Sequence, residues 1–191
     1  MFESIKAKAL FLVPLVVLME FTISLSLGYF TITILGIPFS QGFTWPIRLL
    51  GVLLIFIGLS FLGWLFKYRK PIDIVVSTYV TLSKIGKVIS LEKMSGRTEP
   101  LIIQGPHQQV RHPLYFGVIM IVFGLWLLLD YSFLLITAIL QLIWFSFIVA
   151  PFEEKELQAI FGEQYQKYSE KVPRIIPFIK RPSRNVTTIV L

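Results

Sequence analysis

Residues 113–152 read PLYFGVIMIVFGLWLLLDYSFLLITAILQLIWFSFIVAPF, which is two apolar runs with only Asp130 and Tyr131 between them. Each run has about 17–20 residues and, as a helix rising 1.5 Å per residue, extends for roughly 25–30 Å. That length crosses the hydrocarbon core of a bilayer. Because the connection is a tight turn, the two helices must be antiparallel. The sequence therefore predicts a helical hairpin whose first and last residues lie at the same face of the membrane.

Polar side chains flank this hairpin. Arg111 and His112 come directly before it, and Glu153 and Glu154 come directly after it. We therefore expect the hairpin to bring the two carboxylates back to the level of the Arg-His pair. Pro113 suits the first position of a helix, where its missing N–H removes no hydrogen bond. The free N–H groups and positive dipole end of this helix then point into the polar loop before it.

The composition is that of a helical membrane protein. The chain has 191 residues, of which 55% are hydrophobic and 15% are charged, whereas soluble domains carry about 25% charged residues. Two further apolar runs, 9–34 and 45–66, are long enough to span a bilayer. No run alternates in polarity as barrel strands do. We expect an all-α integral membrane protein. Cysteine is absent, which excludes disulfides and thiolate chemistry.

The net charge of +7 is explained by basic loops on the cytosolic side of the membrane. No basic folded domain is large enough to suggest a nucleic-acid partner. We expect a multi-pass protein of the cell (inner) membrane with its C-terminal part in the cytosol. Glu20 lies inside the first span, where an ionisable group should face a partner. A structural hydrogen bond to a neighbouring helix is the simpler interpretation.

Residues 72–91 are ambiguous between a short tilted span and a helix lying in the interface. If they cross the membrane, the chain has five spans and one basic cluster must face outward. If they lie in the interface, it has four spans and every basic cluster lies inside. Charge alone favours four.

The groups at the hairpin ends suit a ligand with a carboxylate, an ammonium, ribose hydroxyls and an aromatic base, such as S-adenosylmethionine. A helix start with Arg111 and His112 can hold a carboxylate, and a glutamate can accept hydrogen bonds from ribose hydroxyls or an ammonium. The apolar patch 101–103 can cover an adenine. Each feature alone is ordinary, since an Arg-His pair often contacts headgroups and a Glu-Glu pair often ends a helix. No metal is expected, because the spacing matches no site such as His-Glu-x-x-His.

Several short motifs in order resemble the isoprenylcysteine carboxyl methyltransferase family and the wider phospholipid methyltransferase group. The resemblance covers roughly residues 92–180, about half of the chain. Its motifs are Gly105-Pro106-His107, Arg111-His112-Pro113-Leu114-Tyr115-x-Gly117, Glu153-Glu154, Phe161-Gly162-x-x-Tyr165-x-x-Tyr168 and Val172-Pro173.

The resemblance implies about five membrane helices, with a cofactor-binding part in the cytosolic C-terminal region. It divides the chain into N-terminal membrane helices (1–91), a catalytic region (92–180) and a tail (181–191) for which we expect disorder. The cofactor would be S-adenosylmethionine, with S-adenosylhomocysteine as product. The implied cofactor-binding residues are Pro100, Leu101, Ile102, His107, Arg111, His112, Pro113, Leu114, Tyr115 and Glu153.

The chain departs from the family at two points. His107 stands where tyrosine is usual, and 148–150 lack an arginine that looks substrate-facing in eukaryotic members. Arg174 is a candidate replacement, and Glu154 a candidate for positioning the substrate.

The implied reaction is methylation of a prenylated cysteine carboxylate, the substrate entering sideways from the bilayer near Tyr115. A carboxylate is already ionised and needs no general base, so positioning and exclusion of water would dominate catalysis. Two alternatives remain open. Methylation of a phospholipid amine would need a base such as His112 or Glu154. A sterol-reductase-like protein or a non-enzymatic membrane module is the other.

Overall fold

The computed structural model describes residues 2–86 and 100–177, and the expected tail at 181–191 lies outside them. Within these ranges every regular element is helical. The elements are α1 (Phe2–Leu35), α2 (Trp45–Tyr68), α3 (Pro71–Gly86), a 3-10 turn (Gly105–Gln108), α4 (Pro113–Leu129), α5 (Ser132–Trp144), a π-helical turn (Phe145–Val149) and α6 (Ala150–Lys171). The prediction of an all-helical protein is confirmed for the part of the chain described.

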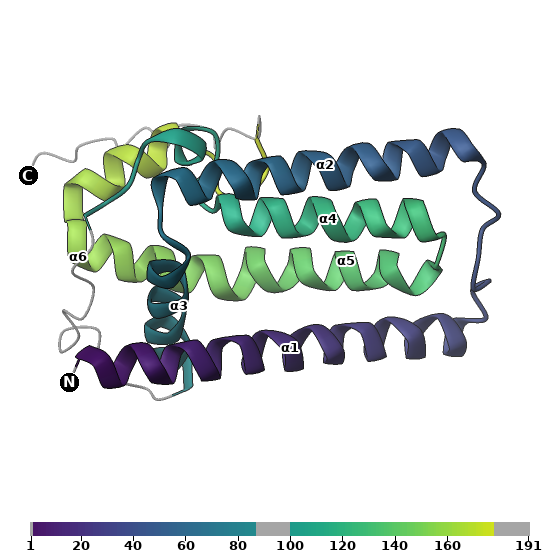
Figure 1. The fold of residues 1–191 in the computed structure, drawn as a ribbon, viewed down its shortest axis with the longest axis horizontal. Coiled ribbons are helices and arrows are strands. Elements are labelled where there is room, and N and C mark those ends of the chain that lie inside the picture. Colours follow the sequence, from purple (N-terminus) through teal and green to yellow (C-terminus); the bar gives the residue numbers. More distant parts are fainter. Residues whose placement is uncertain (1, 87–99, 178–191) are drawn as a thin grey trace, which may run out of the picture.

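Four helices run side by side along the long axis of the molecule. α4 and α5 form the predicted antiparallel hairpin, α2 packs on α4, and α1 packs on α5 (Figure 1). Three helices in the described ranges are long and apolar enough to cross a membrane: Lys6–Leu35, Trp45–Tyr68 and the stretch Ser132–Lys171, which is kinked at Gly162. α4 is apolar but shorter, with 17 residues, which extend for about 25 Å.

Glycines bring α2 and α4 into backbone contact. A Cβ added at Gly51 would lie 2.7 Å from the carbonyl oxygen of Gly124, and one at Gly58 would lie 2.7 Å from that of Gly117. The two pairs have the same spacing on both helices, so their backbones touch along more than one turn. Small residues at such a contact replace the hydrophobic driving force that helices lack in lipid.

Polar side chains inside the membrane region join α1 to α5. The amide nitrogen of Gln141 lies 2.9 and 3.0 Å from the two carboxylate oxygens of Glu20, and Ser24 donates to the same carboxylate. Gln141 is buried. The expectation that Glu20 faces a neighbouring helix through a hydrogen bond is confirmed.

The loop that joins α1 to α2 is hydrogen-bonded to the α4–α5 turn. Asp130 has left-handed backbone angles (φ 60°, ψ 33°), and its carboxylate accepts hydrogen bonds from Ser40 Oγ (2.7 Å), Phe43 N (2.9 Å) and Gln41 N (3.0 Å). Arg48 lies 3.7 Å away. Burial disfavours the charged carboxylate, but these hydrogen bonds outweigh it and lower the pKa of Asp130 to about 2.

α3 runs across the bundle rather than along it, at the end where α1 begins and α2 ends (Figure 1). The chain therefore returns from α3 to the same end from which it left α2. This direction agrees with the alternative in which the segment lies in the interface, and the number of membrane spans stays a prediction. The described part of this segment ends at Gly86. The same end carries the start of α4 and the whole of α6.

Candidate active site

The start of α4 is built as the sequence predicted. Pro113 is the first residue of the helix and His112 is its N-cap, without a side-chain capping bond. The residues just before α4 form backbone hydrogen bonds with the segment after α6. Arg111 N donates to Pro173 O (2.9 Å), and His112 N donates to Arg174 O (3.0 Å). The Arg-His corner is thereby fixed by backbone bonds to residues about sixty positions further along the chain.

The hairpin returns both carboxylates to this corner. Glu153 Oε2 lies 3.1 Å from His112 Nδ1, and Glu154 Oε1 lies 3.5 Å from His112 Nε2 and 3.1 Å from Arg111 Nη2. All four side chains are largely buried. Burial alone would lower the pKa of His112, but the hydrogen bonds and charges of Glu153 and Glu154 outweigh it and raise that pKa. The convergence predicted from helix lengths is confirmed.

Glu154 and Arg174 form a two-pronged ion pair. Arg174 Nη2 lies 2.6 Å and Nε 2.9 Å from the two carboxylate oxygens. Arg174 Nη1 also donates to Ser146 O in the π-helical turn (3.2 Å). The guanidinium thus lies beside the segment preceding the glutamates, where the family's arginine is absent. Neither Arg174 nor Glu154 is among the residues lining the adjacent pocket, so their predicted contact with a substrate has no support from their position.

A pocket opens between this corner, α3 and α6, with about 800 Å³ of space between its walls, part of it open to solvent. The ten residues that the sequence singled out for a cofactor all line it: Pro100, Leu101, Ile102, His107, Arg111, His112, Pro113, Leu114, Tyr115 and Glu153. The structure brings these residues together, and their role toward a cofactor stays a prediction.

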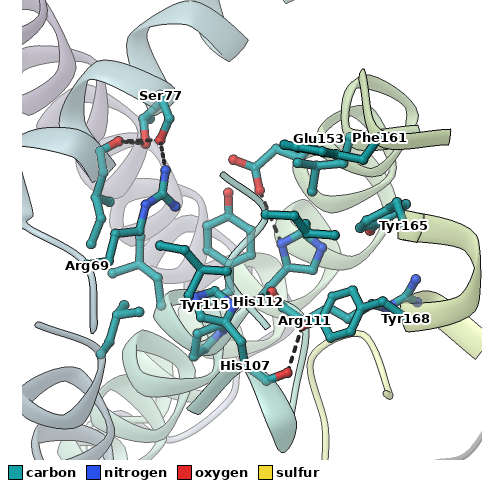
Figure 2. A pocket seen from close by; sticks show the side chains of 18 of the residues that line it. Arg69, Ser77, His107, Arg111, His112, Tyr115, Glu153, Phe161, Tyr165 and Tyr168 are labelled. Carbon is teal, nitrogen blue, oxygen red and sulfur yellow. Dashed lines mark hydrogen bonds and ion pairs between the residues drawn. The ribbon is translucent and has the colours of Figure 1, made fainter. Parts of the chain in front are cut away.

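Two walls of the pocket were not predicted. One comes from the α2–α3 corner and the other from α6, and Figure 2 shows Arg69 and Ser77 opposite Phe161, Tyr165 and Tyr168. Arg69 Nη2 donates to Ser77 Oγ (2.7 Å). The α6 aromatics belong to one of the sequence motifs, so a signal existed for them. The basic clusters around residues 72–91 favoured an interfacial helix there, but they did not indicate that this helix lines the pocket. The unpredicted lining residues are Leu65, Arg69, Ile74, Ser77, Thr78, Leu157, Phe161, Tyr165 and Tyr168.

His107 presents a neutral imidazole to the pocket. Its Nδ1 lies 3.3 Å from Arg111 O, and its own carbonyl accepts a hydrogen bond from Tyr168 Oη (2.7 Å). Burial and the nearby charge of Arg69 lower the pKa of His107 to about 4. With Nδ1–H donating to the carbonyl, Nε2 is left as an acceptor. It is buried, and the described parts of the chain offer it no hydrogen-bond partner.

Three stacked rings close the pocket on the side of the π-helical turn. The ring of Tyr115 lies nearly parallel to His112 on one face (5.3 Å, 11°) and to Phe145 on the other (4.5 Å, 6°). Phe145 belongs to the turn that breaks regular α-helical bonding between α5 and α6. Such π-turns are frequent at functional sites. The stack holds the His112 ring edge-on to the two carboxylates.

Comparison with known proteins gives the following. Residues 47–164 match the family described as phospholipid methyltransferase. Over 135 residues the chain is 31% identical to a methanethiol S-methyltransferase from Crocosphaera subtropica, covering 68% of this chain and 49% of that protein. Over 80 residues it is 34% identical to protein-S-isoprenylcysteine O-methyltransferase B from Arabidopsis thaliana, covering 41% of this chain and 40% of that protein. The chain thus spans about half of these relatives or less. No solved structure matches it.

Proposed function

The chain belongs to the phospholipid methyltransferase family, and from that premise we propose that it is an S-adenosylmethionine-dependent membrane methyltransferase acting on a carboxylate of a lipid-like substrate, such as a prenylated cysteine. The observation that carries the proposal is the single pocket that joins the α4 start, the His112–Glu153 pair and the apolar 100–102 loop.

The residues present fit the proposed cofactor. The α4 start with Arg111 suits its carboxylate, and Glu153 suits its hydroxyls or its ammonium. Leu101 and Ile102 supply apolar cover for a purine. When bound, S-adenosylmethionine supplies an activated methyl group.

The pocket favours an acceptor that is already anionic. Both ring nitrogens of His112 face carboxylates, which stabilise its protonated form. Glu154 is ion-paired with Arg111 and Arg174, and the lowered pKa of His107 makes it a weak base. An ammonium would first have to lose a proton to a base. Within the described residues these groups are poorly suited to that task, so a phospholipid amine is the less favoured acceptor.

The chain's own residues would act by positioning and by exclusion of water. Arg69 adds positive charge to the α3 side of the pocket, which favours an anionic acceptor over a cationic one. Leu65, Ile74 and Leu114 line the pocket with apolar surface suited to a lipid chain. Tyr115, held between two rings, fixes the wall nearest to His112. We place this site at the cytosolic face of the cell membrane, following the basic clusters gathered at that end.

A thiol is the second candidate acceptor. The match to a methanethiol S-methyltransferase extends over 68% of this chain, against 41% for the isoprenylcysteine enzyme. The thiol of cysteine ionises with a pKa of about 8.5 in model peptides, far below that of an alcohol, so a thiol needs a weaker base than an alcohol does to become anionic. The same positively charged wall would favour a thiolate.

Two measurements test the proposal. Calorimetry with S-adenosylhomocysteine on the detergent-purified protein should show saturable binding, and its absence would refute the cofactor. Transfer of tritiated methyl from S-adenosylmethionine is then measured to a prenylcysteine analogue, methanethiol and phosphatidylethanolamine in parallel. We expect the prenylcysteine analogue to be the best acceptor. Preferential labelling of phosphatidylethanolamine would contradict the argument from the missing base.

A further inference from the structure

We propose that Arg174 is a positioning residue for the methyl-transfer site, which acts through Glu154 on His112 without touching cofactor or acceptor. The inference rests on the proposed function, because it assigns a role within that site. It also changes the role predicted from the sequence, where Arg174 was a candidate contact for the substrate.

The first step is the way in which Arg174 holds Glu154. Two guanidinium nitrogens meet the two carboxylate oxygens at 2.6 and 2.9 Å. The Glu154 side chain is 11% exposed and that of Arg174 26% exposed. A two-pronged arginine–carboxylate pair fixes the carboxylate's direction as well as its charge. Arg174 is itself anchored by its bond to Ser146 O. The carboxylate of Glu154 therefore has one favoured orientation.

The second step is what that orientation provides. With Glu154 held, its Oε1 lies 3.5 Å from His112 Nε2 and 3.1 Å from Arg111 Nη2. Glu153 contacts the other ring nitrogen of His112, Nδ1. The two glutamates thus divide their tasks. Glu153 lines the pocket, whereas Glu154 lies outside its lining and faces His112 Nε2 at 3.5 Å, an ion-pair contact rather than a hydrogen bond.

The third step is the backbone. The carbonyl groups of Pro173 and Arg174 accept from the amides of Arg111 and His112. The same short segment therefore fixes the corner through its main chain and orients the buried charges through its side chain. Since Arg174 is outside the pocket lining, its side chain can influence a ligand only through Glu154 and the two pocket residues that Glu154 contacts, His112 and Arg111.

The test compares Arg174→Ala and Arg174→Lys with Lys167→Ala, which removes an exposed pair with Glu163 on α6. Affinity for S-adenosylhomocysteine is measured by calorimetry in one detergent. We expect Arg174→Ala to weaken binding on the order of ten-fold, as for residues of one ion-pair network. Arg174→Lys, which keeps the charge but not the fork, should be intermediate. Lys167→Ala should match the wild type. Added guanidine should restore the affinity of Arg174→Ala and should not change that of the other variants, because the position of the Arg174 side chain is partly exposed to solvent.

A second measurement does not depend on ligand binding. The ¹⁵N shifts of the His112 ring are followed against pH in the ligand-free protein, where it is surrounded by Glu153, Glu154, Arg111, Tyr115 and the nearby His107. If Arg174 only contributed charge, its removal would raise the His112 titration midpoint. If it positions Glu154, its removal lets the carboxylate turn away, and the midpoint falls. A midpoint that rises or does not move would overturn the proposal.

The outcomes separate this proposal from the proposed function. If the wild type binds no S-adenosylhomocysteine, the function fails while the His112 titration still tests Arg174. If Arg174→Ala raises only the KM for the acceptor, with binding and titration unchanged, Arg174 touches the acceptor and the proposal is wrong. If Arg174→Ala is not recovered folded, as judged by thermal unfolding, Arg174→Lys carries both measurements, with a smaller fall in the midpoint expected.

Discussion

The two ends of the helical bundle both hold a buried carboxylate beside an arginine, but the groups around each carboxylate differ. Asp130 accepts from the backbone amides and the hydroxyl of one loop and is buried at 1% exposure. Glu153 and Glu154 face side chains, a histidine and two arginines, at the wall of a pocket. Backbone donors close a turn permanently. Charged side chains can exchange their partners for a ligand. This difference makes the Glu153–Glu154 end a candidate binding site and the Asp130 end a structural contact.

The largest expected effect on ligand binding comes from the histidine at the pocket end. His112→Ala leaves Glu153 and Glu154 without their shared cation, and we expect S-adenosylhomocysteine to bind on the order of 100-fold more weakly, as when one partner of a buried charge pair is removed. Glu153→Ala should act in the same direction. Calorimetry measures both. Full affinity in both variants would remove the distinction between the two ends.

The next effect is pH dependence. Because the pKa of His112 is raised in the folded protein, its charged form contributes stability that is fully present below the unfolded pKa of about 6.5 and lost as pH rises through the folded pKa. We expect thermal stability to fall as pH rises from about 6.5 through the raised pKa of His112. His112→Gln should flatten this part of the profile. An unchanged slope in His112→Gln would assign the dependence to another group.

A helix contact midway between the ends should affect folding more than binding. Gly58→Ala places a Cβ 2.7 Å from Gly117 O, whereas Gly63→Ala meets nothing within 4 Å. We expect the first to lower stability by about 1–3 kcal/mol, the usual range for overpacking. The second is the matched control and should be neutral. Equal stability of the two variants, measured by thermal unfolding, would show that the backbone contact is not essential.

The smallest effect on binding is expected at the far end. Asp130→Asn removes a charge that is hydrogen-bonded to Ser40, Gln41 and Phe43. The hydrogen bonds between the α1–α2 loop and the α4–α5 turn should weaken, so the unfolding temperature should fall. The affinity for S-adenosylhomocysteine should not change. A loss of affinity in this variant, with an unfolding temperature like that of the wild type, would mean that the two ends are coupled through the bundle.

The sequence predicted those parts of the site that follow from helix lengths and local motifs. The hairpin needed only two apolar runs and a tight turn, and its consequence, the meeting of Glu153 with His112, is observed. The α3 wall could not be predicted in this way. The pocket residues Arg69 and Ser77 depend on the direction in which α3 leaves α2, which is set by packing against α1. The partner of Arg174 depends on where a segment after α6 returns, and no local pattern encodes that contact.

The glycine contacts between α2 and α4 have a consequence for the size of what the pocket accepts. Leu65 near the end of α2 and Leu114 at the start of α4 are both pocket residues, and their helices touch backbone to backbone at Gly58 and Gly117. Because the backbones of α2 and α4 are in contact at these glycines, the separation of the two helices is fixed and this side of the pocket does not widen. Room for a larger ligand would then have to come from the side formed by α3 and α6, the other two helices that line the pocket.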